Sequence, residues 1–393
     1  EIYTLSLHDA LPIFGRNHIL NRIRTYVLPD NRIAVLPSEW FVRFGELFRL
    51  GTIVGDAVRL KKYHFRVKEL AENGFVTAEK TETRALPLSA PKALQASLRP
   101  YQMTGFRWLA YLQRNGFGGC LADDMGLGKT LQTIALLLYV YSNTGDKVPQ
   151  KSHQPRQLSL FDEIDAIGEG NESVSLRNDL PPTLIVMPTS LVHNWLNEFR
   201  KFAPQLKVSL HAGANRLREE AFLQQTQLYH IMLTSYGTVR QDIDFLQQCH
   251  LHYIVLDESQ YIKNPSSQIF QCVKHLKSRY KLSLTGTPIE NSITDLWAQM
   301  DFVNDQMLGT VAAFEKRFQA NDLLENERVK TSLLNIVSPF ILRRTKEEVA
   351  PELPPLTEEI RYCEMSQAQA LLYNEEKICQ RSEERRVGKE CRS

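Results

Sequence analysis

The sequence predicts an α/β fold: a doubly wound domain built on a parallel sheet, preceded by a small mixed α/β segment. Short apolar runs alternate with helical patterns, which is typical of buried parallel strands connected by helices. Four such runs lie at residues 184–187, 230–233, 253–256 and 280–284. The 393 residues, 43% hydrophobic and 23% charged, are ordinary for a globular protein of about two domains.

Charge and cysteine content exclude several classes of protein. The net charge of +2 argues neither for nor against nucleic acid, so any DNA-binding surface must be local. The six cysteines form no CxxC pair or Cys/His cluster, which indicates neither a zinc site nor a disulfide framework. No apolar run approaches the roughly 18 to 20 residues of a membrane span, so we expect no membrane association and a cytoplasmic location.

The two ends of the chain are expected to be foreign to the protein. Residues 1–13 can be encoded by a nucleotide string whose reverse complement encodes residues 381–393 without a mismatch. A genuine inverted repeat in the gene is the alternative, but the string resembles a sequencing adapter, and we exclude both ends from the fold prediction. We therefore expect a native protein longer than this chain.

The remaining chain divides into three parts. Residues 14–97 are mixed, with a predicted hairpin at Tyr26–Leu36 and helices at 38–50 and 67–73. The α/β domain is predicted over residues 98–310. It is interrupted at 141–183 by a polar stretch rich in Gly, Ser, Asn, Asp and Pro, which we expect to be a disordered insertion. Residues 311–380 are expected to form a helical extension.

A phosphate-binding loop is predicted within residues 121–133, where a strand should give way to a strongly apolar helix. Gly126 and Gly128 permit the tight backbone that points amides at phosphate, Lys129 can reach the terminal phosphates, and the Thr130 hydroxyl can ligate magnesium. The residues expected to bind the nucleotide here are Asp124, Gly126, Leu127, Gly128, Lys129, Thr130 and Leu131.

One position departs from the strict phosphate-loop pattern. That pattern has glycine at position 123, where this chain has Asp123, so a chance Gly-Lys-Thr turn is the alternative interpretation.

Two adjacent carboxylates, Asp257 and Glu258, follow the apolar strand at 253–256. We expect them at the carboxyl edge of the sheet, beside the phosphate-binding loop. There Asp257 would hold magnesium through water, and Glu258 would orient and polarise the attacking water. A solvated turn is the common alternative for such a pair, but the company of Lys129 favours the catalytic interpretation.

Further segments, in order over about residues 98–355, resemble the Swi/Snf-type DNA-dependent ATPases of helicase superfamily two, in their bacterial form. The resemblance is to the first RecA-like lobe. It implies ATP and Mg²⁺ as cofactors and double-stranded DNA as partner. Residues 98–109 resemble the adenine-recognising segment, in which Gln102 would read the base edge; an amphipathic helix with Tyr101 and Trp108 in the core is compatible with this.

Two turns resemble segments that contact a DNA strand in this family. The first, in residues 184–195, offers the hydroxyls of Thr189 and Ser190 to phosphate, although Ser190 could equally cap a helix. The second offers Thr234 and Ser235, for which a purely structural turn is the alternative.

Residues 282–291 resemble the motif that couples ATP hydrolysis to movement, through Thr285 and Thr287. Many relatives close the acidic motif with histidine, where this chain has Gln260, an amide that hydrogen-bonds but does not titrate near neutral pH. Residues 340–346, followed by Leu-Pro-Pro at 353–355, resemble the passage from the first lobe to the second. They favour Swi/Snf-like members over RNA helicases.

The second lobe and its arginine fingers lie outside the predicted elements. Because a missing arginine finger costs about a thousandfold or more in rate, we expect weak ATP binding and little hydrolysis from this chain alone.

A short motif in the insertion, Gln157, Leu158, Leu160 and Phe161, resembles the pentapeptide by which bacterial proteins dock on the sliding clamp. An apolar patch that folds back on the lobe is the alternative.

The leading functional hypothesis is an ATP-driven double-stranded DNA translocase of the bacterial nucleoid, acting on nucleoid proteins or RNA polymerase. The alternatives are a strand-separating DNA or RNA helicase, and a nucleotide-binding scaffold that recruits partners without useful turnover.

Overall fold

The computed structural model describes residues 2–6, 16–21, 23–28, 31–54, 57–73, 88–142, 180–213, 216–217, 219–286, 293–318, 333–349, 366–374 and 376. The chain divides into two compact units, Glu1–Val349 and Ala350–Ser393. The second unit contributes a helix at residues 367–374. Among the described residues, no helix is both long and apolar enough to span a membrane.

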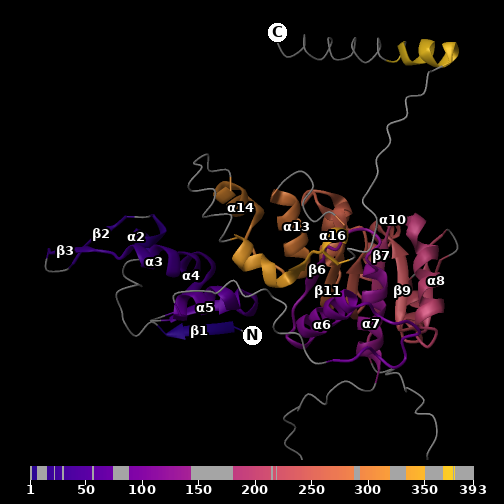
Figure 1. Ribbon diagram of the computed structural model, residues 1–393, viewed down its shortest axis with the longest axis horizontal. Helices are drawn as coiled ribbons and strands as arrows, with labels where there is room; N and C mark the ends of the chain where they lie inside the picture. The colour runs from indigo at the N-terminus through magenta and orange to yellow at the C-terminus, as the bar shows by residue number, and fades with distance from the viewer. Residues whose placement is uncertain are drawn as a thin grey trace, which may run out of the picture. The chain divides into compact units, whose positions relative to one another are not determined.

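The first unit contains a seven-stranded sheet in the order β12-β6-β11-β10-β7-β9-β8, and every paired neighbour is parallel (Figure 1). Every residue of β7, β9 and β10 is buried, as strands covered by helices on both faces require. The strands are β6 (Gly119–Leu121), β7 (Thr183–Met187), β8 (Val208–His211), β9 (Ile231–Ser235), β10 (Leu251–Leu256), β11 (Ser278–Leu284) and β12 (Ile341–Leu342).

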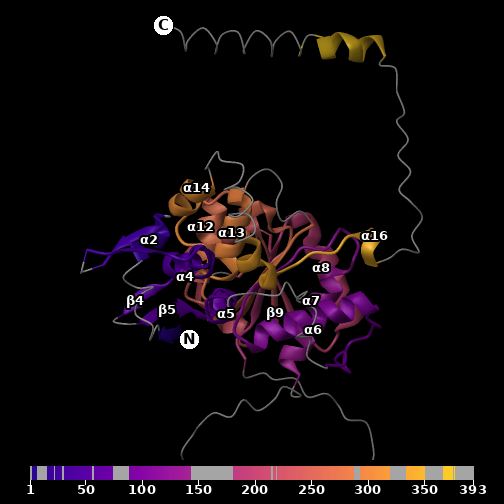
Figure 2. The same ribbon diagram turned by 60° about the vertical axis from the view of Figure 1, so that its left-hand side comes forward.

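Two groups of helices cover the sheet. Helices α6, α7 and α8 pack in series, as do α10, α12, α13 and α14, and the two groups lie on opposite faces (Figure 2). The bounds are α6 (Pro100–Arg114), α7 (Lys129–Tyr141), α8 (Val192–Phe202), α9 (Glu219–Thr226), α10 (Tyr236–Gln241), α11 (Ile243–Leu246), α12 (Gln268–His275), α13 (Ile293–Val303), α14 (Val311–Phe318) and α16 (Lys346–Val349). The predicted doubly wound α/β fold is therefore confirmed.

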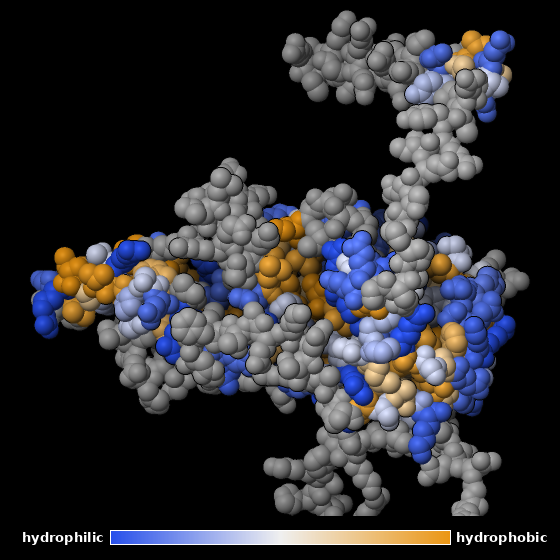
Figure 3. Space-filling model, viewed as in Figure 1, coloured by the Kyte–Doolittle hydropathy of each residue, from blue (hydrophilic) through white to orange (hydrophobic). Residues whose placement is uncertain are grey.

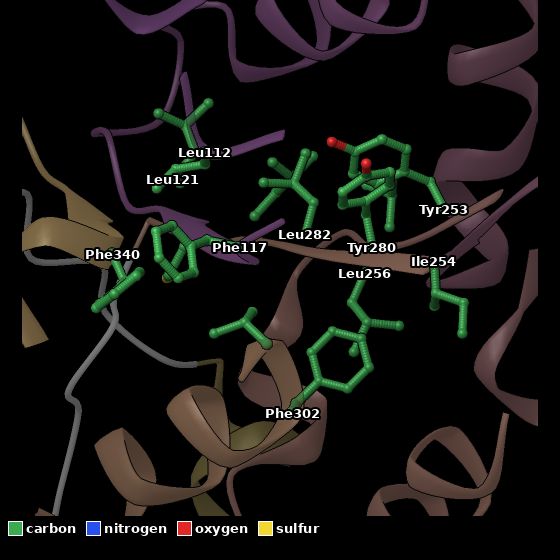
Figure 4. Packing of buried hydrophobic residues seen from close by; sticks show 14 of the residues in the cluster. Leu112, Phe117, Leu121, Tyr253, Ile254, Leu256, Tyr280, Leu282, Phe302 and Phe340 are labelled. Atoms are coloured by element: carbon green, nitrogen blue, oxygen red, sulfur yellow. The ribbon is translucent and has the colours of Figure 1, made fainter. Parts of the chain in front are cut away.

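The core lies where the strands meet these helices. Each large aliphatic or aromatic side chain fully buried there contributes about 1.5 to 3 kcal/mol relative to exposure. Figure 4 shows residues of this core from the strands and from the segments around them: Phe117, Leu121, Ile254, Leu256, Leu282, Phe302 and Phe340.

Two strands of the sheet were not predicted as strands. β8 alternates between buried and exposed residues at one edge of the sheet, so it lacks a continuous apolar run. β12 has two residues and lies in the stretch 311–380, which the sequence analysis assigns to an extension beyond the lobe. The structure instead makes β12 an edge strand of the lobe's own sheet, paired with β6.

A buried ion pair holds the residues after β12 to the loop after β6. Arg344 donates through Nε to Oδ1 of Asp123 at 2.9 Å, and through Nη2 to Oδ2 at 2.5 Å. The same guanidinium donates to the side chain of Gln132 at 2.9 Å and to the carbonyl of Tyr101. One side chain therefore joins α6, α7, the loop after β6 and the segment after β12.

In the segment before the lobe, β2 (Thr25–Val27) pairs antiparallel with β3 (Ile33–Val35), so the predicted hairpin is confirmed. In Figure 3 apolar residues gather on this hairpin, where Val27, Ile33 and Val35 are exposed. The predicted helix at 38–50 is two helices that meet at Phe44. The helices here are α2 (Arg16–Leu20), α3 (Ser38–Arg43), α4 (Gly45–Leu50) and α5 (Phe65–Asn73).

A three-stranded antiparallel sheet completes this segment, in the order β1 (Ile2–Ser6), β5 (Ala57–Lys61), β4 (Thr52–Val54). β1 falls within residues 1–13, which are expected to be foreign to the protein.

We predict that Arg344→Gln lowers the free energy of unfolding by about 3 kcal/mol, because it leaves the Asp123 carboxylate charged and unpaired in the interior. Arg343→Gln is the matched control, since that neighbouring arginine is exposed, and we expect a change within about 0.5 kcal/mol. Urea denaturation followed by circular dichroism measures both. Equal effects of the two substitutions would show that the ion pair contributes no net stability.

Candidate active site

The loop between β6 and α7 has the backbone of a phosphate-binding loop. Gly126 and Gly128 have φ angles of +86° and +76°, in the left-handed region that favours glycine. A Cβ atom on Gly128 would also collide with the side-chain amide nitrogen of Gln102. Because α7 begins at Lys129, the amides of its first turn face the loop, where an anion is favoured.

Lys129 lies folded onto this loop. Its Nζ donates to the carbonyl of Asp123 at 2.7 Å and to that of Asp124 at 3.3 Å. Burial lowers the pKa of Lys129, and the carboxylates of Glu258, Asp123 and Asp257 offset part of that effect. A phosphate entering the loop would offer this ammonium a stronger, charged acceptor than the two carbonyls.

Asp123, the departure from the strict loop pattern, is accommodated because its side chain does not face the loop's interior. The carboxylate is fully buried and forms the ion pair with Arg344. It also accepts a hydrogen bond from Gln132 Nε2 at 3.2 Å. The aspartate therefore belongs to the support of the loop.

Gln102 lies against the loop, and both atoms of its side-chain amide bond to backbone groups. Nε2 donates to the carbonyl of Leu127 at 3.2 Å, and Oε1 accepts from the amide of Arg99 at 3.0 Å. Gln102 thus connects α6 to the loop by a hydrogen bond, while its recognition of adenine stays a prediction.

The acidic pair follows β10. Asp257 is buried, and both its carboxylate oxygens accept hydrogen bonds: Oδ2 from Trp195 Nε1 at 2.7 Å and Oδ1 from the amide of Glu258 at 2.9 Å. Burial raises the pKa of Asp257, and these two hydrogen bonds oppose the rise. Glu258 has φ 48° and ψ 52°, a left-handed conformation that costs a non-glycine residue about 1 kcal/mol or more.

The strand that precedes the acidic pair is not a direct neighbour of the strand before the phosphate-binding loop. β11 lies between β6 and β10. Lys129 nevertheless lies within electrostatic range of both carboxylates, whose charges oppose the lowering of its pKa by burial.

A buried polar cluster on and around the intervening strand supports the turn after β10. Ser283 of β11 bonds the hydroxyl of Ser259 at 2.6 Å and the side chain of Gln299 at 2.5 Å. Gln299 Nε2 donates to the Ser259 carbonyl at 2.7 Å. Sequence reasoning missed these residues, although a serine in a buried strand and a glutamine in an apolar helix were available signals.

Gln260 connects the acidic pair to the predicted coupling motif. Its Nε2 donates to Oε2 of Glu258 at 2.7 Å, and its Oε1 accepts from the Thr285 hydroxyl at 3.2 Å. The amide of Thr285 in turn donates to the Leu121 carbonyl at the end of β6 at 3.2 Å. The structure thus brings Glu258, Gln260 and Thr285 together. Thr287 lies outside the described residues.

The two turns predicted to contact DNA differ. Thr189 and Ser190 are exposed in the short helical turn η3 (Thr189–Leu191), before α8. Thr234 is fully buried and its hydroxyl donates to the His211 carbonyl at 2.8 Å, while Ser235 Oγ caps α10 by accepting from the Thr238 amide at 3.2 Å. The clamp-like residues Gln157, Leu158, Leu160 and Phe161 lie outside the described residues.

The donor set fits magnesium bound chiefly through a nucleotide. Thr130 and Asp257 offer hard oxygen atoms, and no group of three or more His, Cys, Asp or Glu side chains among the described residues forms a metal cage. Mg²⁺ in such sites keeps waters and phosphate oxygens as most of its ligands.

Comparison with known proteins gives one family. The SNF2-related domain matches residues 101–391. YwqA of Bacillus subtilis (strain 168), named as an ATP-dependent helicase/translocase, is 36% identical over 288 residues, which cover 72% of this chain and 27% of YwqA. The TATA-binding protein-associated factor MOT1 of Saccharomyces cerevisiae is 36% identical over 390 residues, or 95% of this chain and 19% of MOT1.

Among solved structures, the SWI2/SNF2 ATPase core of Sulfolobus solfataricus in complex with dsDNA aligns with a TM-score of 0.51 at 38% identity. The alignment covers 66% of this chain and 47% of that one. This chain thus spans less than half of that core and about a quarter of YwqA. The family match covers most of the chain, and its parallel sheet matches a RecA-like α/β lobe, so the chain belongs to the SNF2-related family.

Proposed function

We propose that the protein containing this chain is an ATP-dependent motor that moves along double-stranded DNA without separating its strands and displaces or remodels bound proteins. The observation that carries the proposal is the chain of hydrogen bonds from Glu258 through Gln260 to Thr285. It joins the residue suited to activate water to the segment after β11. A change at the nucleotide can thereby move a neighbouring part of the lobe.

In this proposal each described residue has a chemical task. The loop amides and Lys129 bind the β- and γ-phosphates, and Glu258 orients the attacking water. Thr130 and Asp257 would hold Mg²⁺, which would neutralise charge on the phosphates. The exposed Thr189 and Ser190 contact a DNA phosphate, whereas the burial of Thr234 favours a structural role for that second turn.

Duplex DNA as partner is supported by the Sulfolobus core, which was solved in complex with dsDNA. Action on DNA-bound proteins is in keeping with the relative named as a TATA-binding protein-associated factor. RNA polymerase, nucleoid proteins and, through residues 157–161, the sliding clamp remain proposed partners. Relatives named as helicases favour one other candidate, a strand-separating enzyme with the same ATP chemistry.

We predict that Lys129→Ala lowers ATP hydrolysis by the full-length gene product at least about 100-fold, because it removes the cation that stabilises charge developing on the phosphates. Hydrolysis is measured without nucleic acid, with single strands and with duplex. Lys277→Ala, at an exposed lysine of the same lobe, is the control and should leave the rate unchanged. A duplex-dependent rate abolished only by Lys129→Ala supports the motor. Equal or greater stimulation by single strands or RNA favours a strand-separating enzyme, and nucleotide binding without turnover indicates a scaffold.

We predict that Gln260→Ala lowers duplex-stimulated hydrolysis about 10-fold or more while nucleotide affinity changes less than about twofold, because a hydrogen bond to a charged group contributes about 1.5 to 3 kcal/mol. Gln271→Ala is the matched control, since that amide bonds only the Pro265 carbonyl among the contacts described for it. Steady-state kinetics and fluorescent-nucleotide binding separate the two effects. Unchanged duplex stimulation in Gln260→Ala would remove this residue from the coupling path.

A further inference from the structure

Two aromatic side chains from different helices meet at Asp257. Trp195, on α8, is buried and donates through Nε1 to the carboxylate oxygen Oδ2 at 2.7 Å. Tyr236, the first residue of α10, is buried and donates through its hydroxyl to the carbonyl oxygen of the same residue at 2.8 Å. Asp257 is therefore held at its side chain and its backbone by groups from outside its own strand.

Each of these helices begins at or shortly after the carboxyl end of a strand. α8 follows η3, which carries Thr189 and Ser190, and Tyr236 comes immediately after Ser235 at the end of β9. β7 and β9 are neighbours in the sheet, and β7 pairs with β10. A displacement of η3 with α8, or of the start of α10, would therefore reach Asp257 through one rigid aromatic side chain.

Tyr236 also reaches the turn that contains the catalytic residue. Its ring stacks on Tyr261 with centroids 5.0 Å apart and planes 6° from parallel. Tyr261 belongs to η4 (Ser259–Ile262), a short helix that begins directly after Glu258. Tyr236 thus contacts Asp257 through its hydroxyl and Tyr261, in the turn after Glu258, through its ring.

A packing role alone does not require these polar contacts. A phenylalanine would fill most of either aromatic volume, but it would leave the buried carboxylate or carbonyl short of a donor. The indole N–H leaves Oδ2 a second lone pair and fixes the direction in which it points. A residue that binds Mg²⁺ through water needs such orientation, because Mg²⁺ demands near-ideal octahedral geometry.

We propose that Trp195 and Tyr236 are positioning residues of the nucleotide site, which hold Asp257 by its carboxylate and its carbonyl and make its orientation depend on η3 with α8 after β7 and on the start of α10 after β9. The inference rests on the proposed function, because it takes Asp257 as the magnesium residue and the first turn as a DNA contact. It adds the route by which DNA at the turn after β7 alters the site for magnesium nucleotide.

The test uses conservative substitutions with matched controls. Trp195→Phe and Tyr236→Phe remove one donor each. Trp297→Phe and Tyr141→Phe remove equivalent donors elsewhere in the lobe, where Trp297 bonds the Gly309 carbonyl at 3.1 Å and Tyr141 bonds the Pro181 carbonyl at 2.9 Å. Fluorescent ADP binding to the full-length gene product is titrated with Mg²⁺, and kcat and KM for ATP are measured with and without duplex.

We expect Trp195→Phe to raise the Mg²⁺ concentration for half-maximal ADP binding about 10-fold, the range for a lost partner of a metal-binding residue. ADP binding without Mg²⁺ stays unchanged. Duplex stimulation of kcat falls in both variants and in neither control. If Trp195→Phe fails to fold, Tyr236→Phe, which removes a single oxygen atom, decides the matter through the loss of duplex stimulation.

Two failures can be told apart. Wild-type Mg²⁺ dependence and wild-type duplex stimulation in both variants overturn the positioning role while the motor stands. If Trp195→Phe shifts the Mg²⁺ dependence but duplex does not stimulate the wild-type protein, Trp195 positions Asp257 and the proposed function is overturned. Losses of equal size in the controls reduce Trp195 and Tyr236 to structural residues.

Discussion

The buried ion pair between Arg344 and Asp123 is the interaction on which the candidate site depends. It lies at the start of the phosphate-binding loop and joins the residues after the last strand of the sheet to α6 and α7. Two buried charges that satisfy each other tolerate little displacement, since loss of either partner leaves an uncompensated charge. The loop can therefore be shaped for phosphate, with two glycines in left-handed conformations, and still remain anchored.

The rest of the candidate site consists of polar side chains joined to one another by hydrogen bonds. Glu258 accepts from Gln260, Gln260 accepts from Thr285, and Asp257 accepts from Trp195. These bonds connect the residues after β10 to the residue after β11 and to α8. The strained backbone of Glu258 persists because hydrogen bonds among Ser259, Ser283 and Gln299 hold the turn that follows it. The side chains of the candidate site are therefore joined to one another and to their support by hydrogen bonds.

The sequence predicted the strands and the loop where the signal is local. Unbroken apolar runs mark β7, β9 and β10, and glycines at 126 and 128 mark positive φ. The order of strands depends on contacts distant in the chain, so β11 between the loop and the acidic pair could not be derived. β12 owes its place to two residues and to Arg344. Nor does a hydroxyl in a turn reveal its direction: Ser190 faces solvent and Thr234 bonds inward. The replacement of histidine by Gln260 indicated a hydrogen bond, and the structure supplies both partners.

The central claim, movement along duplex DNA driven by this site, is tested most directly by displacement of a triplex-forming third strand by the full-length gene product. A motor that tracks along the duplex removes the third strand in an ATP-dependent reaction and leaves a forked duplex without a triplex paired. An enzyme that unwinds the fork but leaves the third strand in place would contradict the account.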